Sequence, residues 1–191
     1  MPPKAKITKD MIVDAAFEIV RSEGVENINA RTVSEKLNCS TQPVMYHFAT
    51  IEALKKTVYA KADRYHSEYL MHIHNPQKGV MLGIGLNYIR FAIEESHLFR
   101  FLFQSNGFNG TPLPEMIDAA ELMPVILAMQ EAVGGGSIEQ VKEIFLTVFL
   151  FVHGYASLIA NNSLAYDEDL IEAHLEQAYQ GAILATQEDT K

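Results

Sequence analysis

Apolar residues recur every three or four positions along most of the chain, which is the period of an α-helix with one buried face. An apolar stripe from Ile12 to Val20, followed by Gly24 as a stop signal, predicts the first long helix. The same period predicts helices over residues 52–74, 78–96, 98–104, 115–133 and 168–186. No segment alternates apolar and polar residues as a half-buried strand does. The pattern therefore predicts an all-α fold.

Turn and cap signals separate these helices. Residues 105–114, SNGFNGTPLP, have the composition of a loop. Ser137 and Gln140 form a capping-box pattern at the start of a long apolar helix, and Asp167 is placed to cap the last helix.

A short amphipathic helix is predicted over residues 30–37. Asn29 is suited to cap its first turn, and Val33 and Leu37 fall on one face at helical spacing. Asn38 follows where the chain must reverse, and asparagine tolerates the left-handed backbone of a helix end.

A second short helix is predicted over residues 41–48, directly after that turn. Ser40 can cap it, and Pro43 is tolerated because first-turn amides have no intrahelical partner. Val44 and Phe48, four residues apart, can face inward while polar side chains face outward. Two short helices joined by a tight turn, the second with a polar outer face, indicate a helix-turn-helix that places its second helix in the DNA major groove.

The residue types on this motif suit contacts to DNA. Glutamine pairs with adenine through two hydrogen bonds, threonine reaches several base edges or a phosphate, and an apolar side chain meets the thymine methyl group. The residues predicted to bind DNA are Asn29, Arg31, Thr32, Ser40, Thr41, Gln42, Met45, Tyr46, His47 and Lys55. The alternative is that the two helices belong to an ordinary helical bundle.

About the first third of the chain resembles the TetR family of bacterial transcriptional regulators. The matching elements are Ile12, Ala15, Ala16 and Gly24, then Tyr46-His47-Phe48, then Glu52 and Leu54. The chain has Asn38, Ser34 and Ile51 where the family often has Gly, Ala and Lys, and Lys55 and Lys56 stand one turn after Ile51. The resemblance implies a three-helix DNA-binding domain at residues 1–50 and a ligand-binding and dimerisation bundle at residues 51–191.

The segment Phe151–Leu158 resembles the H-G-x-x-x-L signature of the WHG-type subgroup of that family. The resemblance implies that the last two long helices pack against their counterparts in a second subunit. Small residues on these helices also permit close approach between helices. The residues predicted to form the homodimer interface are Val152, Tyr155, Ala156, Ile159, Leu175, Ala178 and Ala182.

A pocket for a small apolar or amphipathic inducer is a further hypothesis. Aromatic and methionine side chains give apolar walls, and a histidine gives one polar anchor. The predicted lining is Phe91, Phe99, Phe103, Met123, Met129, Phe145, Phe149 and His153. The alternative is that these residues are ordinary core.

The net charge is −9, but it is distributed unevenly. Residues 1–66 carry 10 Lys and Arg against 8 Asp and Glu, whereas residues 67–191 carry 5 against 16. Acid is thus concentrated away from the predicted DNA-binding segment. Lys4, Lys6 and Lys9 form a cationic start that can follow a phosphate backbone, and its alternative is a solvated tail.

The composition also sets the expected compartment. The single cysteine, Cys39, fits a reducing cytoplasm and is expected to plug the turn between the short helices rather than to act as a redox switch. Lys9, Asp10 and Asp14 interrupt the first apolar stretch, so no secretory signal is expected. The longest apolar run, residues 144–160, is shorter than the roughly 20 residues of a membrane span. Neither a membrane location nor a membrane partner is expected.

Little in the sequence suggests catalysis. His66, Glu68, His72 and His74 do not converge on one helix face, so neither a metal nor another cofactor is predicted. Phosphate-binding loops and nucleophile–base patterns are also missing, so an enzyme is not expected. The sequence therefore predicts a ligand-responsive repressor that binds a palindromic operator as a homodimer. The alternatives are an activator of the same family and a small-molecule-binding bundle with a non-functional DNA head.

Overall fold

The computed structural model describes residues 7–73, 79–105, 115, 122–162 and 164–188, and all regular elements in these ranges are helical. The predicted all-α fold is confirmed. The chain packs as two compact units. Unit 1 comprises residues 1–65 and 95–107, and unit 2 comprises residues 66–94 and 108–191. Residues 106–114 of the predicted loop, residues 116–121 of the helix predicted at 115–133, and the residues Lys4, Lys6 and His74 lie outside the described residues.

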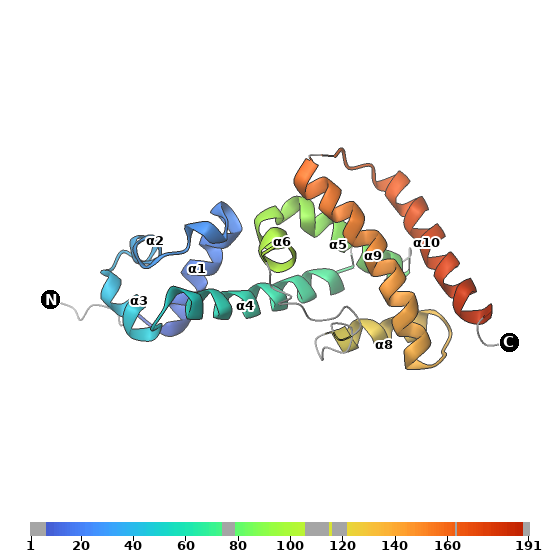
Figure 1. Ribbon diagram of the computed structural model, residues 1–191, viewed down its shortest axis with the longest axis horizontal. Coiled ribbons are helices and arrows are strands. Elements are labelled where there is room, and N and C mark those ends of the chain that lie inside the picture. The colour runs from blue at the N-terminus through green and yellow to red at the C-terminus, as the bar shows by residue number, and fades with distance from the viewer. Residues whose placement is uncertain (1–6, 74–78, 106–114, 116–121, 163, 189–191) are drawn as a thin grey trace. The chain divides into compact units, whose positions relative to one another are not determined.

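Unit 1 contains the helix-turn-helix and the helical segments that pack with it (Figure 1). Its elements are α1 (Lys9–Glu23), the 3₁₀ turn η1 (Val25–Asn27), α2 (Ala30–Lys36), α3 (Thr41–His47), the first part of α4 (Ile51–Met71) and α6 (Ser96–Phe103). Its core is built from apolar side chains at helical spacing, among them Ile12, Val33, Val44, Leu54 and Leu98, each fully buried. The packing unit thus extends beyond residue 50, where the sequence places the domain boundary.

A buried carboxylate ties α6 to α1 and α4 within unit 1. Glu95, which precedes α6, accepts hydrogen bonds from Arg21 Nε at 2.8 and 2.9 Å and from the Tyr65 hydroxyl at 2.9 Å. The hydrogen bonds to Glu95 raise the pKa of Arg21 above its ordinary value, so the guanidinium stays charged. A buried carboxylate needs such partners, because an uncompensated buried charge is costly.

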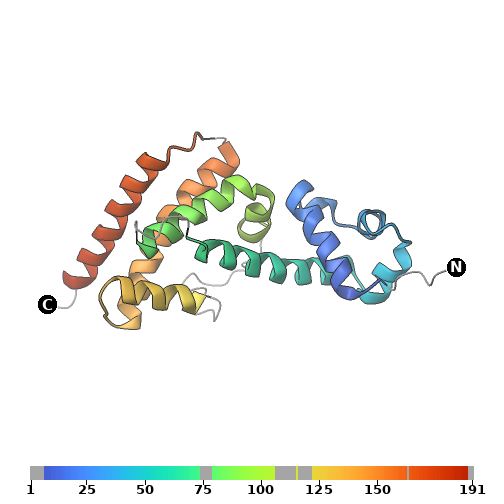
Figure 2. The ribbon, with the colours of Figure 1, turned by 180° about the vertical axis from the view of Figure 1, so that it is seen from behind.

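Unit 2 is a bundle in which α9 contacts α5, α8 and α10. Its helices are α5 (Val80–Glu94), α8 (Met123–Ala132), α9 (Ile138–Asn162) and α10 (Glu168–Glu188). α9 and α10 lie side by side in both ribbon views (Figures 1 and 2). The predicted capping box is confirmed, since Ser137 and Gln140 exchange hydrogen bonds of 3.0 and 3.2 Å, and Asp167 accepts from the Leu170 amide.

α9 is the one helix of the described residues that is long and apolar enough to cross a membrane by length and composition alone. The 17-residue run is therefore part of a longer, 25-residue helix. Its contacts with α5, α8 and α10 are those of a helix within a bundle.

The glycines of α5 allow close packing at one point in particular. A Cβ at Gly85 would lie 2.6 Å from Leu175 Cδ2, and Leu175 and the neighbouring Val152 are both buried. We expect Gly85→Ala to destabilise the protein by about 1–3 kcal/mol, because a fixed core cannot make room for the methyl group. Urea unfolding measures this difference.

Gly83→Ala is the matched control on the same helix. Its added methyl group would meet Ile73, which is only half-buried and can turn away. We expect the free energy of unfolding of Gly83→Ala to stay close to that of the wild type, because the better helix propensity of alanine offsets the contact with Ile73. Equal losses of unfolding free energy in Gly83→Ala and Gly85→Ala would contradict the packing described for Gly85.

His66 on α4 is buried in unit 2 between two aromatic rings. Its ring centroid lies 5.4 Å from that of Tyr88 and 4.8 Å from that of Phe91. Burial lowers the pKa of His66 to about 3 from an ordinary value of 6.5. Below pH 6.5 the unfolded chain therefore binds a proton that the folded chain excludes. The free energy of unfolding consequently decreases as the pH is lowered.

The expected result is a loss of about 1.4 kcal/mol per pH unit below pH 6.5 relative to a His66→Phe variant. Urea unfolding at intervals between pH 7.5 and 4.5 provides the measurement. His72→Phe, at an exposed position near the end of α4, is the control and should not change the slope. Parallel pH profiles for the wild type and His66→Phe would rule out a buried neutral imidazole.

Candidate nucleic-acid interface

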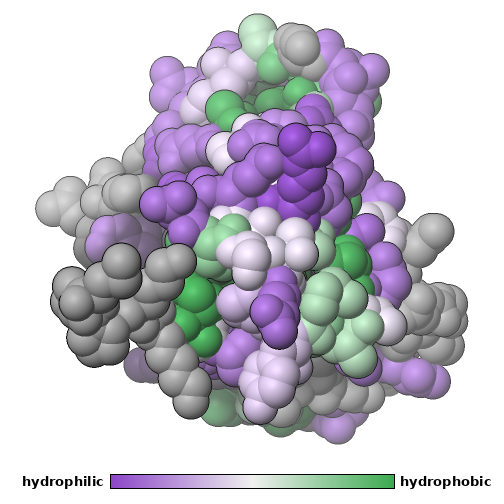
Figure 3. Space-filling model, turned by 90° about the vertical axis from the view of Figure 1, so that its left-hand side faces the viewer, coloured by the Kyte–Doolittle hydropathy of each residue, from purple (hydrophilic) through white to green (hydrophobic). Residues whose placement is uncertain are grey.

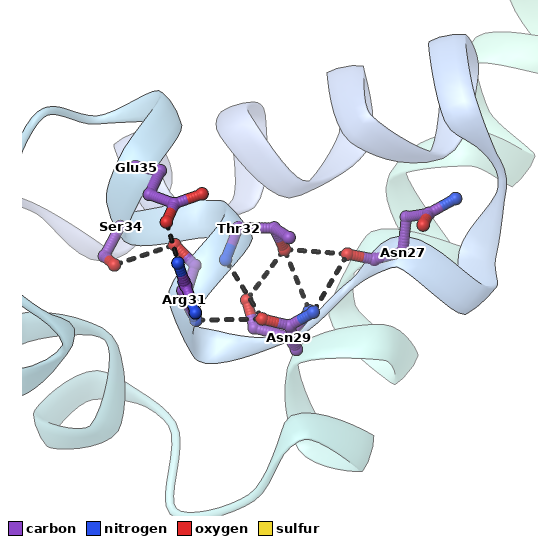
Figure 4. A network of polar contacts seen from close by, with 6 residues as sticks. All are labelled: Asn27, Asn29, Arg31, Thr32, Ser34 and Glu35. Atoms are coloured by element: carbon purple, nitrogen blue, oxygen red, sulfur yellow. Dashed lines mark hydrogen bonds and ion pairs between the residues drawn. The ribbon is translucent and has the colours of Figure 1, made fainter.

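The helix-turn-helix begins with a network of hydrogen bonds around Asn29 (Figure 4). The Asn29 side chain accepts from the amides of Arg31 and Thr32, each at 3.0 Å, and the Asn29 amide donates to Thr32 Oγ1 at 3.2 Å. Thr32 Oγ1 also donates to the carbonyl of Asn27 at 2.7 Å. These bonds satisfy the free amides at the start of α2 and fix its direction.

The turn between α2 and α3 has the predicted left-handed residue. Asn38 has a φ of 50°, and the Cys39 amide donates to the Ser34 carbonyl at 2.9 Å. Asparagine is one of the few side chains that adopts this conformation at low cost. Ser40 occupies the N-cap position of α3, but its side chain makes no capping hydrogen bond, so the predicted role of that side chain is wrong. The Ser40 hydroxyl is exposed instead.

α3 is held by its inner face and exposed on its outer face. Val44 is fully buried and Phe48, directly after the helix, is 4% exposed. On the other side Tyr46 is 83% and Met45 is 46% exposed, with Gln42 also exposed. The surface around this helix mixes hydrophilic, weakly polar and apolar side chains (Figure 3). A rigid helix with such a face suits the edges of bases in a major groove.

The predicted DNA-binding residues fall into two groups in the structure. Ser40, Thr41, Gln42, Met45 and Tyr46 present exposed side chains on α3 or at its start. The others take part in contacts within the chain.

Asn29 and Thr32 belong to the cap network described above. The Arg31 guanidinium donates to Glu35 at 2.8 Å, and Lys55 Nζ lies 3.3 Å from a carboxylate oxygen of Glu52. The Arg31–Glu35 pair is exposed on both sides and so contributes little stability, whereas the Lys55 side chain is 29% exposed.

His47 is the middle residue of the Tyr46-His47-Phe48 element. Its Nε2 lies 3.2 Å from the carbonyl oxygen of Ile7, and since a carbonyl only accepts, Nε2–H is the donor. Lys36 is an exposed cation in the last turn of α2 that was missing from the predicted set. Lys56, which the sequence offers beside Lys55, is exposed in the second turn of α4.

Comparison with known proteins identifies the chain. The model of the tetracyclin repressor-like C-terminal domain matches residues 81–180, which is more than half of the chain. The chain belongs to the TetR family of transcriptional regulators. It is 25% identical over 181 residues to the HTH-type transcriptional regulator YobS of Bacillus subtilis strain 168, covering 91% of this chain and 90% of YobS.

Solved structures of TetR-like regulators share the fold. A TetR-family regulator from Streptomyces coelicolor aligns with a TM-score of 0.72 at 10% identity, over 93% of this chain and 80% of that one. A transcriptional regulator from Rhodococcus sp. Rha1 aligns with a TM-score of 0.68 at 14% identity, over 94% and 97%. The TetR assignment makes this chain a DNA-binding regulator with a helix-turn-helix, and not an enzyme.

The residues predicted to line an inducer pocket do not all share one unit. Phe99 and Phe103 belong to unit 1, whereas the other six belong to unit 2. Phe91, Phe99 and Met129 are fully buried. Within unit 2, Phe145, Phe149 and His153 are half-buried on α9 and stack along the helix.

A pocket of about 210 Å³ lies elsewhere in unit 2. It is lined by the start of α5, the end of α8 and the middle of α10, through Gly79, Val80, Met81, Leu82, Ala132, Leu175, Glu176, Tyr179 and Gln180. None of these is among the eight predicted residues. The volume is below the roughly 300–1,000 Å³ typical of ligand pockets.

Most of the residues predicted for the dimer interface are turned into the subunit itself. Val152, Ala156, Ile159, Leu175 and Ala182 are each at most 8% exposed, and Tyr155 and Ala178 are half-buried. The physical reason is that this face of α9 and α10 packs within the bundle, where Leu175 and Val152 meet α5 at Gly85. These five side chains have little surface left for a second chain.

The opposite face of the same two helices is exposed and partly apolar. Leu150 and Leu158 on α9 are 51% and 52% exposed, and Leu170 and Leu184 on α10 are 50% and 61% exposed. Among the described residues, no group of three or more His, Cys, Asp and Glu is placed to hold a metal ion.

Proposed function

We propose that this TetR-family regulator is a cytoplasmic, homodimeric repressor that binds a palindromic operator and releases it when a small molecule binds. The observation that carries the DNA-reading part is the outer face of α3. Thr41, Gln42, Met45 and Tyr46 are exposed there, on a helix anchored by the buried Val44. This combination gives base-reading side chains on a rigid support.

The experiment that tests the DNA-reading part is selection of duplexes from a random pool by the full-length protein. We expect enrichment of one inverted repeat, because a two-fold dimer presents two copies of α3 to two half-sites. Failure to enrich any sequence would contradict operator binding. A reporter under the selected operator in cells with and without the gene then separates a repressor from an activator.

We place the dimer contact on the outward face of α9 and α10. Leu150, Gly154 and Leu158 follow one another at intervals of four residues on α9, and Leu170 and Leu184 stand on α10. A Cβ at Gly154 would meet no atom of its own chain, so the space beside it is open to a second helix. Exposed leucines on two helices that pack together suit an interface between subunits.

The aromatic row of α9 is the proposed ligand site. The rings of Phe145 and Phe149 are nearly parallel, with centroids 6.0 Å apart, and the His153 ring follows at 5.6 Å. His153 Nδ1 lies 2.9 Å from the Tyr88 hydroxyl, and its Nε2 lies 3.3 Å from Ser157 Oγ. Burial lowers the pKa of His153, which favours the neutral ring. This lining favours a planar, uncharged, largely apolar molecule.

A relative supports the class of ligand. The structure of EbrR is described as that of a multidrug binding protein in complex with imidazole, and it aligns with a TM-score of 0.60 at 15% identity over 88% of this chain and 93% of EbrR. A thermal-shift screen of flat aromatic compounds tests ligand binding here, with Phe149→Ala as the matched variant. If no compound changes the melting temperature, the proposal that unit 2 binds an inducer is contradicted.

A ligand bound in unit 2 can affect the helix-turn-helix of unit 1 through α4. α4 runs from unit 1 into unit 2, and two tyrosines one turn apart on it bind consecutive carboxylates. Tyr65 donates to Glu95 in unit 1, and Tyr69 donates to Glu94 in unit 2 at 2.7 Å. A ligand that favours a different packing of unit 2 therefore acts on α4. A coupling free energy of about 1–3 kcal/mol suffices for a 5- to 150-fold fall in operator affinity.

The competing proposal is a bundle that sequesters a lipophilic molecule and carries a non-functional DNA head. The exposed outer face of α3, on a helix anchored by the buried Val44, favours the regulator over this alternative. A mobility-shift assay with the selected operator separates the two, because a non-functional head would leave both native and scrambled duplexes unshifted.

A further inference from the structure

The 210 Å³ pocket of unit 2 lies where three helices meet, at the start of α5, the end of α8 and the middle of α10. Leu175 and Met81 line it and are buried, whereas Val80, which also lines it, is exposed. The pocket therefore reaches from the core of the bundle to the surface, where a small molecule can enter it. It shares no lining residue with the aromatic row of α9.

Two chemically different walls face each other across this pocket. Glu176, Tyr179 and Gln180 are three and four residues apart on α10, so they lie on one face of that helix and form a polar wall. The apolar side chains that α5 and α8 contribute are Val80, Met81, Leu82 and Ala132. A pocket with one polar and one apolar wall suits an amphipathic ligand.

The polar wall favours a positively charged group. Of the described lining residues, Glu176 alone carries a charge. Tyr179 stands three residues further along the same face, so one ammonium group can contact the Glu176 carboxylate and the Tyr179 ring together. Acidic residues also outnumber basic ones by 16 to 5 over residues 67–191, which raises the concentration of cations near this unit.

The volume limits the size of the ligand. Cavities of about 150 Å³ hold benzene. A pocket of about 210 Å³ therefore accommodates a benzene-sized body with about three further non-hydrogen atoms.

We propose that this pocket is a second ligand site, which binds a small primary ammonium compound with a hydrocarbon body of about benzene size. The ammonium group contacts the Glu176 carboxylate and the Tyr179 ring, and the body packs on Val80, Leu82 and Ala132. The site is separate from the aromatic row of α9, and binding at it does not depend on operator binding.

Titration with 2-phenylethylammonium, followed by NMR, is the test. The full-length protein is labelled with ¹³C at its methionine methyl groups, because Met81 lines the pocket and Met45 lies in unit 1. We expect the Met81 resonance, assigned with Met81→Leu, to shift with a dissociation constant of about 0.1–1 mM, while the Met45 resonance stays in place. The neutral isostere 2-phenylethanol should bind about 3- to 10-fold more weakly.

Substitutions on α10 test the polar wall. Glu176→Gln keeps the size of the side chain and removes its charge, and we expect about 2- to 5-fold weaker binding because the carboxylate is exposed. Tyr179→Leu removes the ring and should cost a similar factor, so the double variant should bind about tenfold more weakly. Glu143→Gln is the control, because Glu143 is exposed on α9 in the same unit but does not line the pocket.

Three outcomes would overturn the proposal. An unshifted Met81 resonance would mean that the pocket stays empty. Equal affinities for the ammonium compound and the alcohol would mean that the polar wall does not recognise charge. Binding that is lost in Phe149→Ala but kept in Glu176→Gln/Tyr179→Leu would place the compound at the aromatic row of α9 instead.

Discussion

Tyr46→Ala is expected to lose roughly 30- to 20,000-fold in operator affinity while its folding stability stays unchanged. Tyr46 is 83% exposed on α3, so its ring contributes little to the packing of unit 1. A well-placed contact to a base contributes about 1–3 kcal/mol, and a dimer loses two copies of it. Fluorescence anisotropy with the selected operator, alongside thermal unfolding, measures both quantities.

Tyr46→Phe is a second variant at the same position, and it tests the hydroxyl group separately from the ring. It keeps the ring and removes the hydroxyl, so it separates a hydrogen bond to a phosphate or base from an apolar contact with a thymine methyl group. If Tyr46→Ala binds the operator as tightly as the wild type over a range of salt concentrations, the outer face of α3 does not read DNA. The regulator account would then lose its main support.

Gly154→Glu/Leu158→Glu is expected to convert the protein from a dimer into a monomer. Both positions lie on the exposed face of α9, so the carboxylates remain hydrated in the single subunit and the fold is retained. In a two-fold dimer, the two substitutions in each subunit would bury four carboxylates without partners. Their burial costs several kcal/mol. We expect dissociation to be favoured by more than about 1,000-fold. Sedimentation equilibrium should give 21.4 kDa in place of twice that mass.

Leu127→Glu is the matched control for this variant. Leu127 on α8 is 50% exposed, nearly the same as Leu158, but it lies outside the proposed interface. We expect it to remain dimeric and to bind the operator. A Gly154→Glu/Leu158→Glu protein that stays dimeric would place the subunit contact on another face.

Most of the fold could be predicted from interactions between residues close together in the sequence. The cap by Asn29, the left-handed Asn38 and the Ser137–Gln140 box each depend on residues within four positions of one another, so the sequence contains the complete interaction. Ser40 was the exception, because a residue of the right type at an N-cap still needs a side-chain rotamer that reaches the amide.

Faces and long-range contacts could not be predicted in the same way. α9 is apolar on nearly every side, so periodicity does not decide whether Val152 or Leu150 faces the bundle. The contact of His47 with Ile7 joins residues 40 positions apart, and no local pattern encodes it. Phe99 was grouped with the pocket because it is aromatic, but α6 packs against α1 in unit 1.

In the proposed complex, two copies of α3 read one palindrome. Hydroxyl-radical footprinting of the selected operator tests it most directly, because it maps the backbone positions that the bound protein covers. We predict two equally protected patches, related by the two-fold axis of the sequence and centred one helical turn or a small multiple of it apart. A single unsymmetrical patch, or protection that ignores the inverted repeat, would contradict it.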